Sequence, residues 1–231
     1  MMSSRLLMPL FWGATILLVV VGVAMAAFYA PVEETMGPIQ KVFYFHMPVA
    51  VTTFGAALVV FIASLGFLWQ RRSHWDDLAH AGAQVTVLYA SIVLLTGMIW
   101  AKQAWGYWWT WSPRLTFSLI LWLLYVVYLM IRSSIEAPER RALVSAVYGV
   151  IAFLDVPLVY FSTKLLPDIH PASIELAPEM RQTLLVWLVA TPMLCAGFIA
   201  MKYRLLRMTA AAEPQAEAEA APGAMPAGEQ S

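Results

Sequence analysis

Long apolar stretches separated by short polar segments make up most of the chain. Six stretches reach the length of about 17–25 residues that a helix needs to cross a bilayer. They cover residues 9–30, 49–69, 81–101, 115–131, 143–165 and 183–203. An open sheet leaves backbone groups unpaired in hydrocarbon, whereas a helix pairs its own. The pattern therefore predicts an all-α polytopic membrane protein with six transmembrane helices.

The two ends of the chain need separate interpretations. Arg5 precedes the first stretch, and Ala24-Met25-Ala26 resembles a signal-peptide cleavage site. The apolar run exceeds the ~7–15 residues of such signals, so we interpret it as a retained span. Residues 209–231 are rich in Ala, Glu, Pro and Gly and hold too few apolar residues for a core. We expect one transmembrane domain over residues 1–208 and a disordered cytoplasmic tail over residues 209–231.

Lysine and arginine are distributed unevenly between the two sets of connecting segments. Nine lie in the N-terminus, the second and fourth loops and the C-terminus, and five lie in or beside the first, third and fifth loops. Positively charged segments stay on the cytoplasmic side of a membrane. The distribution predicts that both termini are cytoplasmic. The loop between the third and fourth helices then faces the periplasm or its equivalent.

Composition removes several classes of protein. Apolar residues of the set AVILMFWYC make up 61% of the chain and charged residues 12%, with a mean hydropathy of +0.71. A soluble domain has roughly a quarter of its residues charged, so a soluble enzyme and a disordered protein are both excluded. The formal net charge is zero, which leaves no basic field to hold a nucleic acid. Cys195 is the single cysteine, so the chain has no internal disulfide.

Tryptophan is concentrated in one short part of the sequence. Five of the ten tryptophans lie between positions 100 and 111, namely Trp100, Trp105, Trp108, Trp109 and Trp111. The segment 105–111, Trp-Gly-Tyr-Trp-Trp-Thr-Trp, is the predicted third loop, and we name it the tryptophan loop. An aromatic belt places one or two tryptophans at several helix ends. This concentration instead favours a surface for a large flat apolar ligand, on which indoles can stack.

The four histidines divide between the two sides of the predicted membrane. His74 and His80 lie in the second loop among charged residues, which is typical of solvated side chains. His46 and His170 lie in the first and fifth loops, on the same side as the tryptophan loop. Two neutral imidazoles can hold a heme iron from opposite faces, whereas a zinc site needs three or four ligands. The second pair therefore favours heme over zinc.

The fourth helix is predicted to begin at Ser112-Pro113-Arg114. Serine is a good N-cap residue, and proline suits the first helical position. A helix N-terminus with an arginine in its first turn can bind an anion such as a porphyrin propionate. Alternatively, Arg114 only extends to the membrane interface. The sequence leaves both interpretations of Arg114 open.

One ionisable residue lies well inside a predicted span. Asp155 stands two residues before Pro157 in the fifth stretch. A charged group at this depth is costly, and Pro157 leaves a nearby backbone carbonyl without its helical partner. We favour a neutral Asp155 that donates a hydrogen bond to that carbonyl, and a functional role for this ionisable group is the alternative.

Three segments of the chain carry a resemblance to a known family. Residues 105–116, Trp-Gly-Tyr-Trp-Trp-Thr-Trp-Ser-Pro-Arg-Leu-Thr, contain a tryptophan-rich signature. His46 lies in residues 41–48, Lys-Val-Phe-Tyr-Phe-His-Met-Pro. His170 lies in residues 153–171. Together they resemble the WWD signature and flanking segments of the heme exporter protein C (CcmC) family of cytochrome c maturation. The resemblance covers residues 41–203, and the tryptophan signature is its most specific part.

The resemblance implies a heme-handling function. A protein of this family holds heme b non-covalently, in transit, at the periplasmic face of a bacterial inner membrane. By position, His46 and His170 match the axial ligands of the iron, and Trp105, Trp108, Trp109 and Trp111 match the heme platform. The resemblance further implies delivery of heme to a CcmE-type heme chaperone, with CcmA and CcmB transporter subunits and a small CcmD-type protein as partners. Such a protein transfers heme rather than catalysing bond-making chemistry.

Two questions remain open from the sequence. The family usually has an aspartate after the last tryptophan, where this chain has Ser112. Serine keeps a capping residue at this position, but the negative charge beside Arg114 is lost.

The residues also fit two other kinds of protein, namely a bis-histidine heme b electron carrier and a permease subunit without a cofactor. An absorbance spectrum separates the permease subunit from the two heme proteins. Transfer of heme to a partner separates the heme-delivery protein from the electron carrier.

Overall fold

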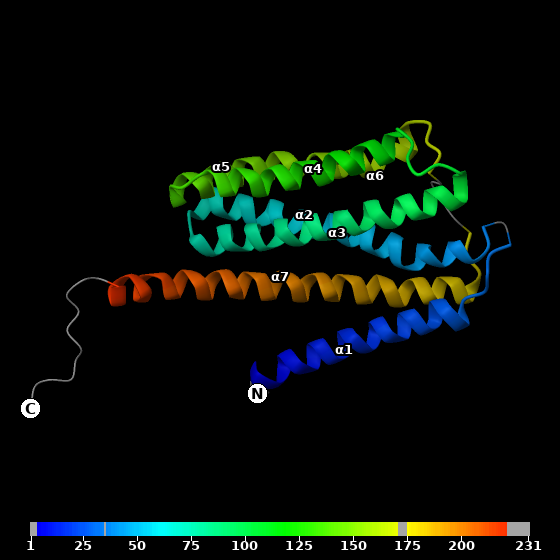
Figure 1. The fold of residues 1–231 in the computed structure, drawn as a ribbon, viewed down its shortest axis with the longest axis horizontal. Helices are drawn as coiled ribbons and strands as arrows, with labels where there is room; N and C mark the ends of the chain where they lie inside the picture. The colour runs from blue at the N-terminus through cyan, green and yellow to red at the C-terminus, as the bar shows by residue number, and fades with distance from the viewer. Residues whose placement is uncertain (1–3, 35, 171–174, 221–231) are drawn as a thin grey trace, which may run out of the picture.

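The computed structural model describes residues 4–34, 36–170 and 175–220, whose helices run side by side as a bundle (Figure 1). The elements are α1 (Ser4–Ala24), the π-helical turn η1 (Met25–Tyr29), the 3-10 turn η2 (Pro38–Val42), α2 (Phe43–Gln70), α3 (Ser73–Trp105), α4 (Pro113–Ser134), α5 (Pro138–Ala152), α6 (Asp155–Leu165) and α7 (Pro178–Ala220). Six helical units are long and apolar enough to cross a membrane, among them Leu7–Tyr29, Pro38–Gln70 and Pro138–Lys164. The prediction of an all-α chain with six helices of membrane-spanning length is confirmed.

Proline and glycine set several of the helix ends. Pro38, Pro113, Pro138 and Pro178 stand at the starts of η2, α4, α5 and α7. Proline costs little there, because the first N–H groups of a helix have no partner inside it. At the other end of α3, Gly106 adopts a left-handed conformation with φ of 81°, and its N–H bonds to the helix. This turn leads the chain into the tryptophan loop.

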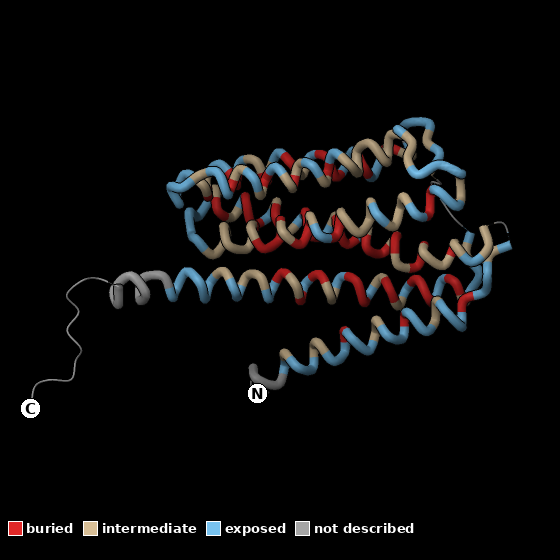
Figure 2. The backbone as a smooth tube through the Cα atoms, in the orientation of Figure 1, coloured by how far each residue is buried: buried red, intermediate tan, exposed pale blue. Residues whose placement is uncertain are grey.

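The helices α2 and α3 form the centre of the bundle. The helices α4, α5 and α6 cover one side of this pair, and α7 followed by α1 lies on the other side (Figure 1). Ala57 and Ala63 of α2 and Ala83 of α3 are fully buried beside Tyr125 of α4. Small residues let membrane helices approach closely. By contrast, α1 packs mainly on α7, and most of its surface is exposed (Figure 2).

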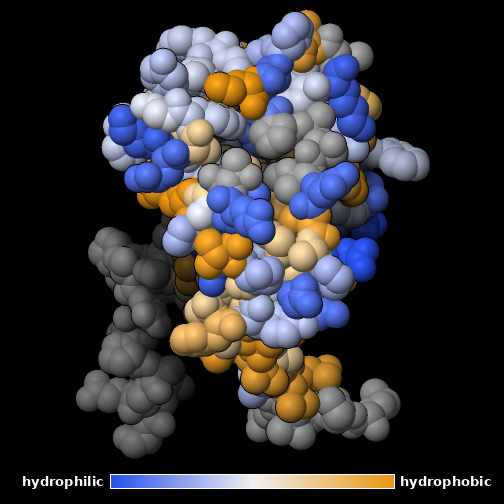
Figure 3. Space-filling model, turned by 90° about the vertical axis from the view of Figure 1, so that its right-hand side faces the viewer, coloured by the Kyte–Doolittle hydropathy of each residue, from blue (hydrophilic) through white to orange (hydrophobic). Residues whose placement is uncertain are grey.

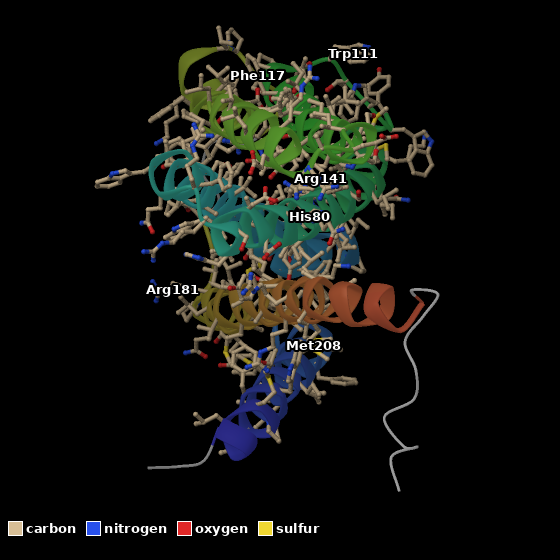
Figure 4. All side chains as sticks on the ribbon, turned by 90° about the vertical axis from the view of Figure 1, so that its left-hand side faces the viewer. His80, Trp111, Phe117, Arg141, Arg181 and Met208 are labelled. Carbon is tan, nitrogen blue, oxygen red and sulfur yellow. The ribbon has the colours of Figure 1, made fainter. Side chains whose placement is uncertain are left out.

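The two ends of the bundle carry different groups. The tryptophan loop and η2 lie at one end, on the right of Figure 1. At the opposite end, Arg132 of α4 donates two hydrogen bonds to Asp76 of α3, at 2.5 and 2.9 Å. His80 and Arg141 lie near the middle of the view from this end (Figure 4). His74 and His80, both in the first turns of α3, therefore lie away from the tryptophan loop.

The second span begins earlier than the sequence predicts. His46, expected in a loop, lies in the first turns of α2, and Pro48, expected at the helix start, lies inside it. The helix follows η2 without a break. Phe43 and Tyr44 are buried in one cluster with Trp100 of α3. Packing against α3 therefore stabilises helical turns that the apolar pattern alone does not include.

The fifth span is interrupted at Phe153 and Leu154, between α5 and α6. Pro157 has no N–H for the carbonyl of Phe153, which instead accepts a hydrogen bond from the N–H of Val156 at 3.0 Å. Asp155 is buried beside this break, and its Oδ2 has no hydrogen-bond partner among the described residues. The expected hydrogen bond from Asp155 to this carbonyl is absent among the described residues, where the carbonyl is bonded to the N–H of Val156 instead.

The last helix extends past the predicted end of the membrane domain at residue 208. It continues to Ala220, so the first part of the predicted tail is helical. Alanine and glutamate, which dominate residues 210–220, are strong helix formers and can extend a helix that packing has already started. The remaining residues of the predicted tail, 221–231, lie outside the described residues.

Candidate functional site

A cavity of about 370 Å³ lies at the end of the bundle that carries the tryptophan loop. Its walls come from α2, α3, α4 and α6 and from the segment that follows α6. The volume falls within the range of roughly 300–1,000 Å³ that is typical of ligand pockets. The predicted site residues that border the cavity are His46, His170, Trp105, Trp109 and Arg114. The tertiary structure thus gathers most of the predicted site into one pocket.

His46 reaches the cavity from α2 and is held against α3. Only 9% of its surface is exposed, and its Nδ1 lies 2.8 Å from Oγ1 of Thr96. No hydrogen bond to its other ring nitrogen, Nε2, is present in the part of the chain that the structure describes. A Cβ added at Gly97 would lie 3.1 Å from Cε1 of His46. The glycine therefore lets the backbone of α3 pass close to the imidazole.

Trp100 of α3 connects the two histidines. Its ring centroid is 6.1 Å from that of His46 and 6.1 Å from that of His170. The Trp105 ring lies 6.2 Å from His170, so His170 contacts two indoles. Sequence reasoning does not select Trp100 as a site residue, because it lies in a predicted span. Its place at the start of the tryptophan-rich stretch 100–111 is the signal that could have identified it.

The tryptophan loop divides into residues that line the cavity and residues on the surface. Trp105 and Trp109 border the cavity, whereas Trp108 and Trp111 are 59% and 75% exposed. The rings of Trp109 and Trp111 meet edge to face, with centroids 5.8 Å apart. Viewed from this end, hydrophobic side chains stand among hydrophilic ones (Figure 3). The predicted platform therefore lies partly inside the cavity and partly at its rim.

Arg114 turns toward α6 and His170. Its Nη2 donates to Oγ1 of Thr163 at 2.8 Å and to the carbonyl oxygen of Tyr160 at 3.3 Å. Its Nη1 lies 3.5 Å from Nδ1 of His170. The guanidinium is therefore part of the cavity wall, where it joins α4 to α6.

The N-terminus of α4 is capped by Asp168 rather than by Ser112. The backbone of Ser112 has the extended conformation of an N-cap, but its buried hydroxyl makes no hydrogen bond to any described residue. One oxygen of Asp168 accepts a hydrogen bond from the N–H of Arg114, and the other accepts from the N–H of His170, both at 2.8 Å. The predicted side-chain cap by Ser112 is therefore wrong, because a carboxylate from a distant segment takes its place.

Buried donors around the cavity fit a ligand with acceptor groups. Nε1 of Trp100, Nε1 of Trp109 and Nε of Arg114 have no hydrogen-bond partner among the described residues, although buried donors are normally paired. The described residues contain no group of three or more His, Cys, Asp or Glu that could hold a metal ion. Two imidazoles are nevertheless sufficient for a heme iron, because the porphyrin supplies the other four ligands. The residues at this cavity therefore fit heme.

Comparison with known proteins agrees with the resemblance seen in the sequence. The family model described as "Heme exporter protein C" matches residues 1–220. The chain belongs to the heme exporter protein C family.

Relatives that carry the name heme exporter protein C come from several bacteria. The protein of Rhodobacter capsulatus is 36% identical over 160 residues, which cover 66% of this chain and 66% of the relative. The protein of Bradyrhizobium diazoefficiens is 32% identical over 174 residues, which cover 75% of this chain and 65% of the relative. The protein of Escherichia coli K12 is 27% identical over 199 residues, which cover 84% of this chain and 80% of the relative. The chain thus spans just under two thirds of the length of the first two heme exporter proteins.

Proposed function

We propose that this chain binds heme in the cavity, with His46 and His170 as axial ligands of the iron, and delivers it to a periplasmic heme chaperone for the maturation of c-type cytochromes. One observation carries the proposal. Two histidines from separate segments, α2 and the segment after α6, reach one cavity and contact the same indole, Trp100. This arrangement suits a flat ligand whose metal is approached from both faces.

The polar groups of the cavity can orient heme within it. Arg114 and Lys164 both border the cavity, and heme carries two propionates that need cationic or hydrogen-bonding partners. The Nζ atom of Lys164 lies 4.8 Å from the ring of Tyr160, beside the cavity wall. The remaining lining is mainly apolar, which suits the porphyrin ring. We therefore assign the propionates to the side of the cavity formed by α4 and α6.

Delivery requires that bound heme can be reached by a receiving protein. The side chains of Tyr107, Trp108 and Trp111 are more than half exposed at the rim, and exposed aromatic groups of this kind serve protein contacts. By the distribution of positive charge, this end faces the periplasm. A CcmE-type chaperone is the proposed acceptor. CcmA and CcmB transporter subunits and a CcmD-type protein are the proposed membrane partners.

The tryptophans at the rim and in the lining should affect different steps. Replacement of Trp105 or Trp109 by alanine should lower heme content two- to tenfold, because an aromatic contact contributes about 0.5–1.5 kcal/mol beyond area burial. Replacement of Trp108 or Trp111 should leave heme content near that of the parent chain and lower transfer. Heme is quantified in the separated chain and in a co-expressed chaperone. Trp69→Ala is the matched control, because Trp69 is 88% exposed at the other end of α2.

The same measurement distinguishes the proposed function from the alternatives. An electron carrier would retain its heme and transfer none to the chaperone. A permease subunit without a cofactor would show no heme spectrum in any variant. Either result would exclude the delivery function. Loss of transfer in Trp69→Ala equal to that in Trp108→Ala would show that the rim has no specific role.

Arg114 should slow the loss of heme from the site. Arg114→Ala removes both the cation at the cavity wall and the contacts to Thr163 and His170. Hydrogen bonds to charged groups contribute about 1.5–3 kcal/mol, so heme should leave roughly ten times faster or more. Transfer of heme to apomyoglobin in detergent gives the rate. Arg181→Ala is the control, since Arg181 is exposed in the first turns of α7. Equal rates for Arg114→Ala and the parent chain would remove Arg114 from the site.

A further inference from the structure

We propose that Thr96 is a positioning residue for the heme ligand His46. By accepting a hydrogen bond from Nδ1, its hydroxyl holds His46 in the tautomer whose Nε2 lone pair is available to iron. The inference rests on the proposed function and deepens it, because it explains how His46 is oriented before heme binds. It rests on the placement of three groups, namely the imidazole of His46, the hydroxyl of Thr96 and the backbone carbonyl of Ile92.

The hydroxyl proton of Thr96 is already used in a hydrogen bond within α3. Its Oγ1 lies 2.7 Å from the carbonyl oxygen of Ile92, one turn earlier on α3, and 2.8 Å from Nδ1 of His46. A carbonyl oxygen can only accept, so the single hydroxyl proton must point to Ile92. If it pointed to His46 instead, two oxygen lone pairs would face each other at 2.7 Å. Thr96 therefore accepts the second hydrogen bond, and Nδ1 of His46 carries a proton.

The tautomer of His46 follows from the direction of this hydrogen bond. A neutral imidazole carries one proton, so a protonated Nδ1 leaves Nε2 with a free electron pair. His46 also borders the cavity, while Thr96 is not among the cavity-lining residues. The ring thus has one nitrogen bonded to the helix wall and the other available to a ligand. Heme iron held through Nε2 would take this electron pair, and no proton would have to leave the imidazole.

The surroundings of His46 leave few other partners for Nδ1. The residue is almost fully buried, so water is a poor substitute for the hydroxyl. The backbone of α3 at Gly97 packs against Cε1, and Trp100 covers another side of the ring. Without Thr96, a proton on Nδ1 would be buried and unpaired, which costs free energy. The other tautomer, with its proton on Nε2 toward the cavity, would then be favoured.

The decisive variant is Thr96→Val, which keeps the β-branched shape and removes the hydroxyl. Nitrogen-15 NMR of the heme-free chain labelled at histidine reports which ring nitrogen of His46 is protonated, and the His46→Ala spectrum assigns the signal. Thr96→Val should move the proton of His46 from Nδ1 to Nε2. It should also weaken heme binding about 10- to 100-fold, the usual effect of losing a group that orients a metal ligand. Thr96→Ser should restore both properties.

Thr86→Val provides a matched control on the same helix. Thr86 is buried and makes the same type of hydrogen bond, from its hydroxyl to the carbonyl of Gly82 at 2.9 Å. This variant should keep both the His46 tautomer and the heme affinity, although it also loses a buried threonine hydroxyl of α3. An unchanged tautomer in Thr96→Val, or an equal loss of affinity in Thr86→Val, would overturn the proposal. The tautomer is measured without heme, so that result does not depend on the proposed heme function. Failure of the heme function would instead appear as a normal heme content in His46→Ala.

Discussion

Replacement of His46 or His170 by alanine is expected to lower the heme content of the purified chain tenfold or more. Each variant removes one of the two imidazoles that approach the cavity, and a tenfold loss corresponds to only ~1.4 kcal/mol. No other side chain can replace the missing imidazole, because the described part of the chain holds no third His, Cys, Asp or Glu grouped with these two histidines. The pyridine hemochrome assay measures the heme that remains.

His74 and His80 provide the controls for this experiment. Both lie in the first turns of α3, at the opposite end of the bundle from Trp100 and Trp105, which end the same helix. Their replacement by alanine should leave heme content unchanged. If all four histidine variants retained equal amounts of heme, the assignment of the axial pair would be wrong. If only one of the two site variants lost heme, the iron would have a single protein ligand from this pair.

Removal of the Asp168 carboxylate is expected to weaken heme retention, whereas removal of the Ser112 hydroxyl should not. Asp168 accepts hydrogen bonds from the N–H groups of Arg114 and His170, so Asp168→Ala frees two donors at once. Loss of a helix cap costs about 0.5–2 kcal/mol. In this chain the same change also releases the segment that carries His170. We expect heme to dissociate roughly tenfold faster, as measured by transfer to apomyoglobin.

Ser112→Ala is the matched control, because both residues stand at the same helix N-terminus. The Ser112 hydroxyl has no hydrogen-bond partner among the described residues, so its loss should leave both heme retention and thermal stability near parent values. Asp168→Asn should give an intermediate rate, since an amide keeps an accepting oxygen but loses the charge. Faster heme loss in Ser112→Ala than in Asp168→Ala would show that serine, not aspartate, is the effective cap.

The carboxylate at the start of α4 also bears on how this chain departs from the WWD pattern. Serine follows the last tryptophan here, where the resemblance leads one to expect aspartate. The structure nevertheless places a carboxylate at this helix end, because Asp168 reaches it from the segment after α6. A negative charge close to the N-terminus of a helix is stabilising. The helix therefore keeps a charged cap although residue 112 is neutral.

The sequence by itself determined the number of helices of membrane-spanning length and which histidines share an end of the bundle. Six apolar runs of membrane-spanning length predict six helices, because every backbone group must be paired within its own segment in hydrocarbon. The alternation of six spans also places His46 and His170 at one end and His74 and His80 at the other. These conclusions depend only on run length and on chain direction. Neither property requires knowledge of which helices touch.

Only the tertiary structure decided how the site is built. Packing of Phe43 and Tyr44 against Trp100 extends α2 over His46, and the path of the chain after α6 brings Asp168 to α4. The same packing places Trp105 and Trp109 in the cavity and leaves Trp108 and Trp111 outside it. Such contacts join residues that are far apart in the sequence. A local pattern can identify the residue types of the site, but the partner of each side chain is fixed by the folded arrangement of the helices.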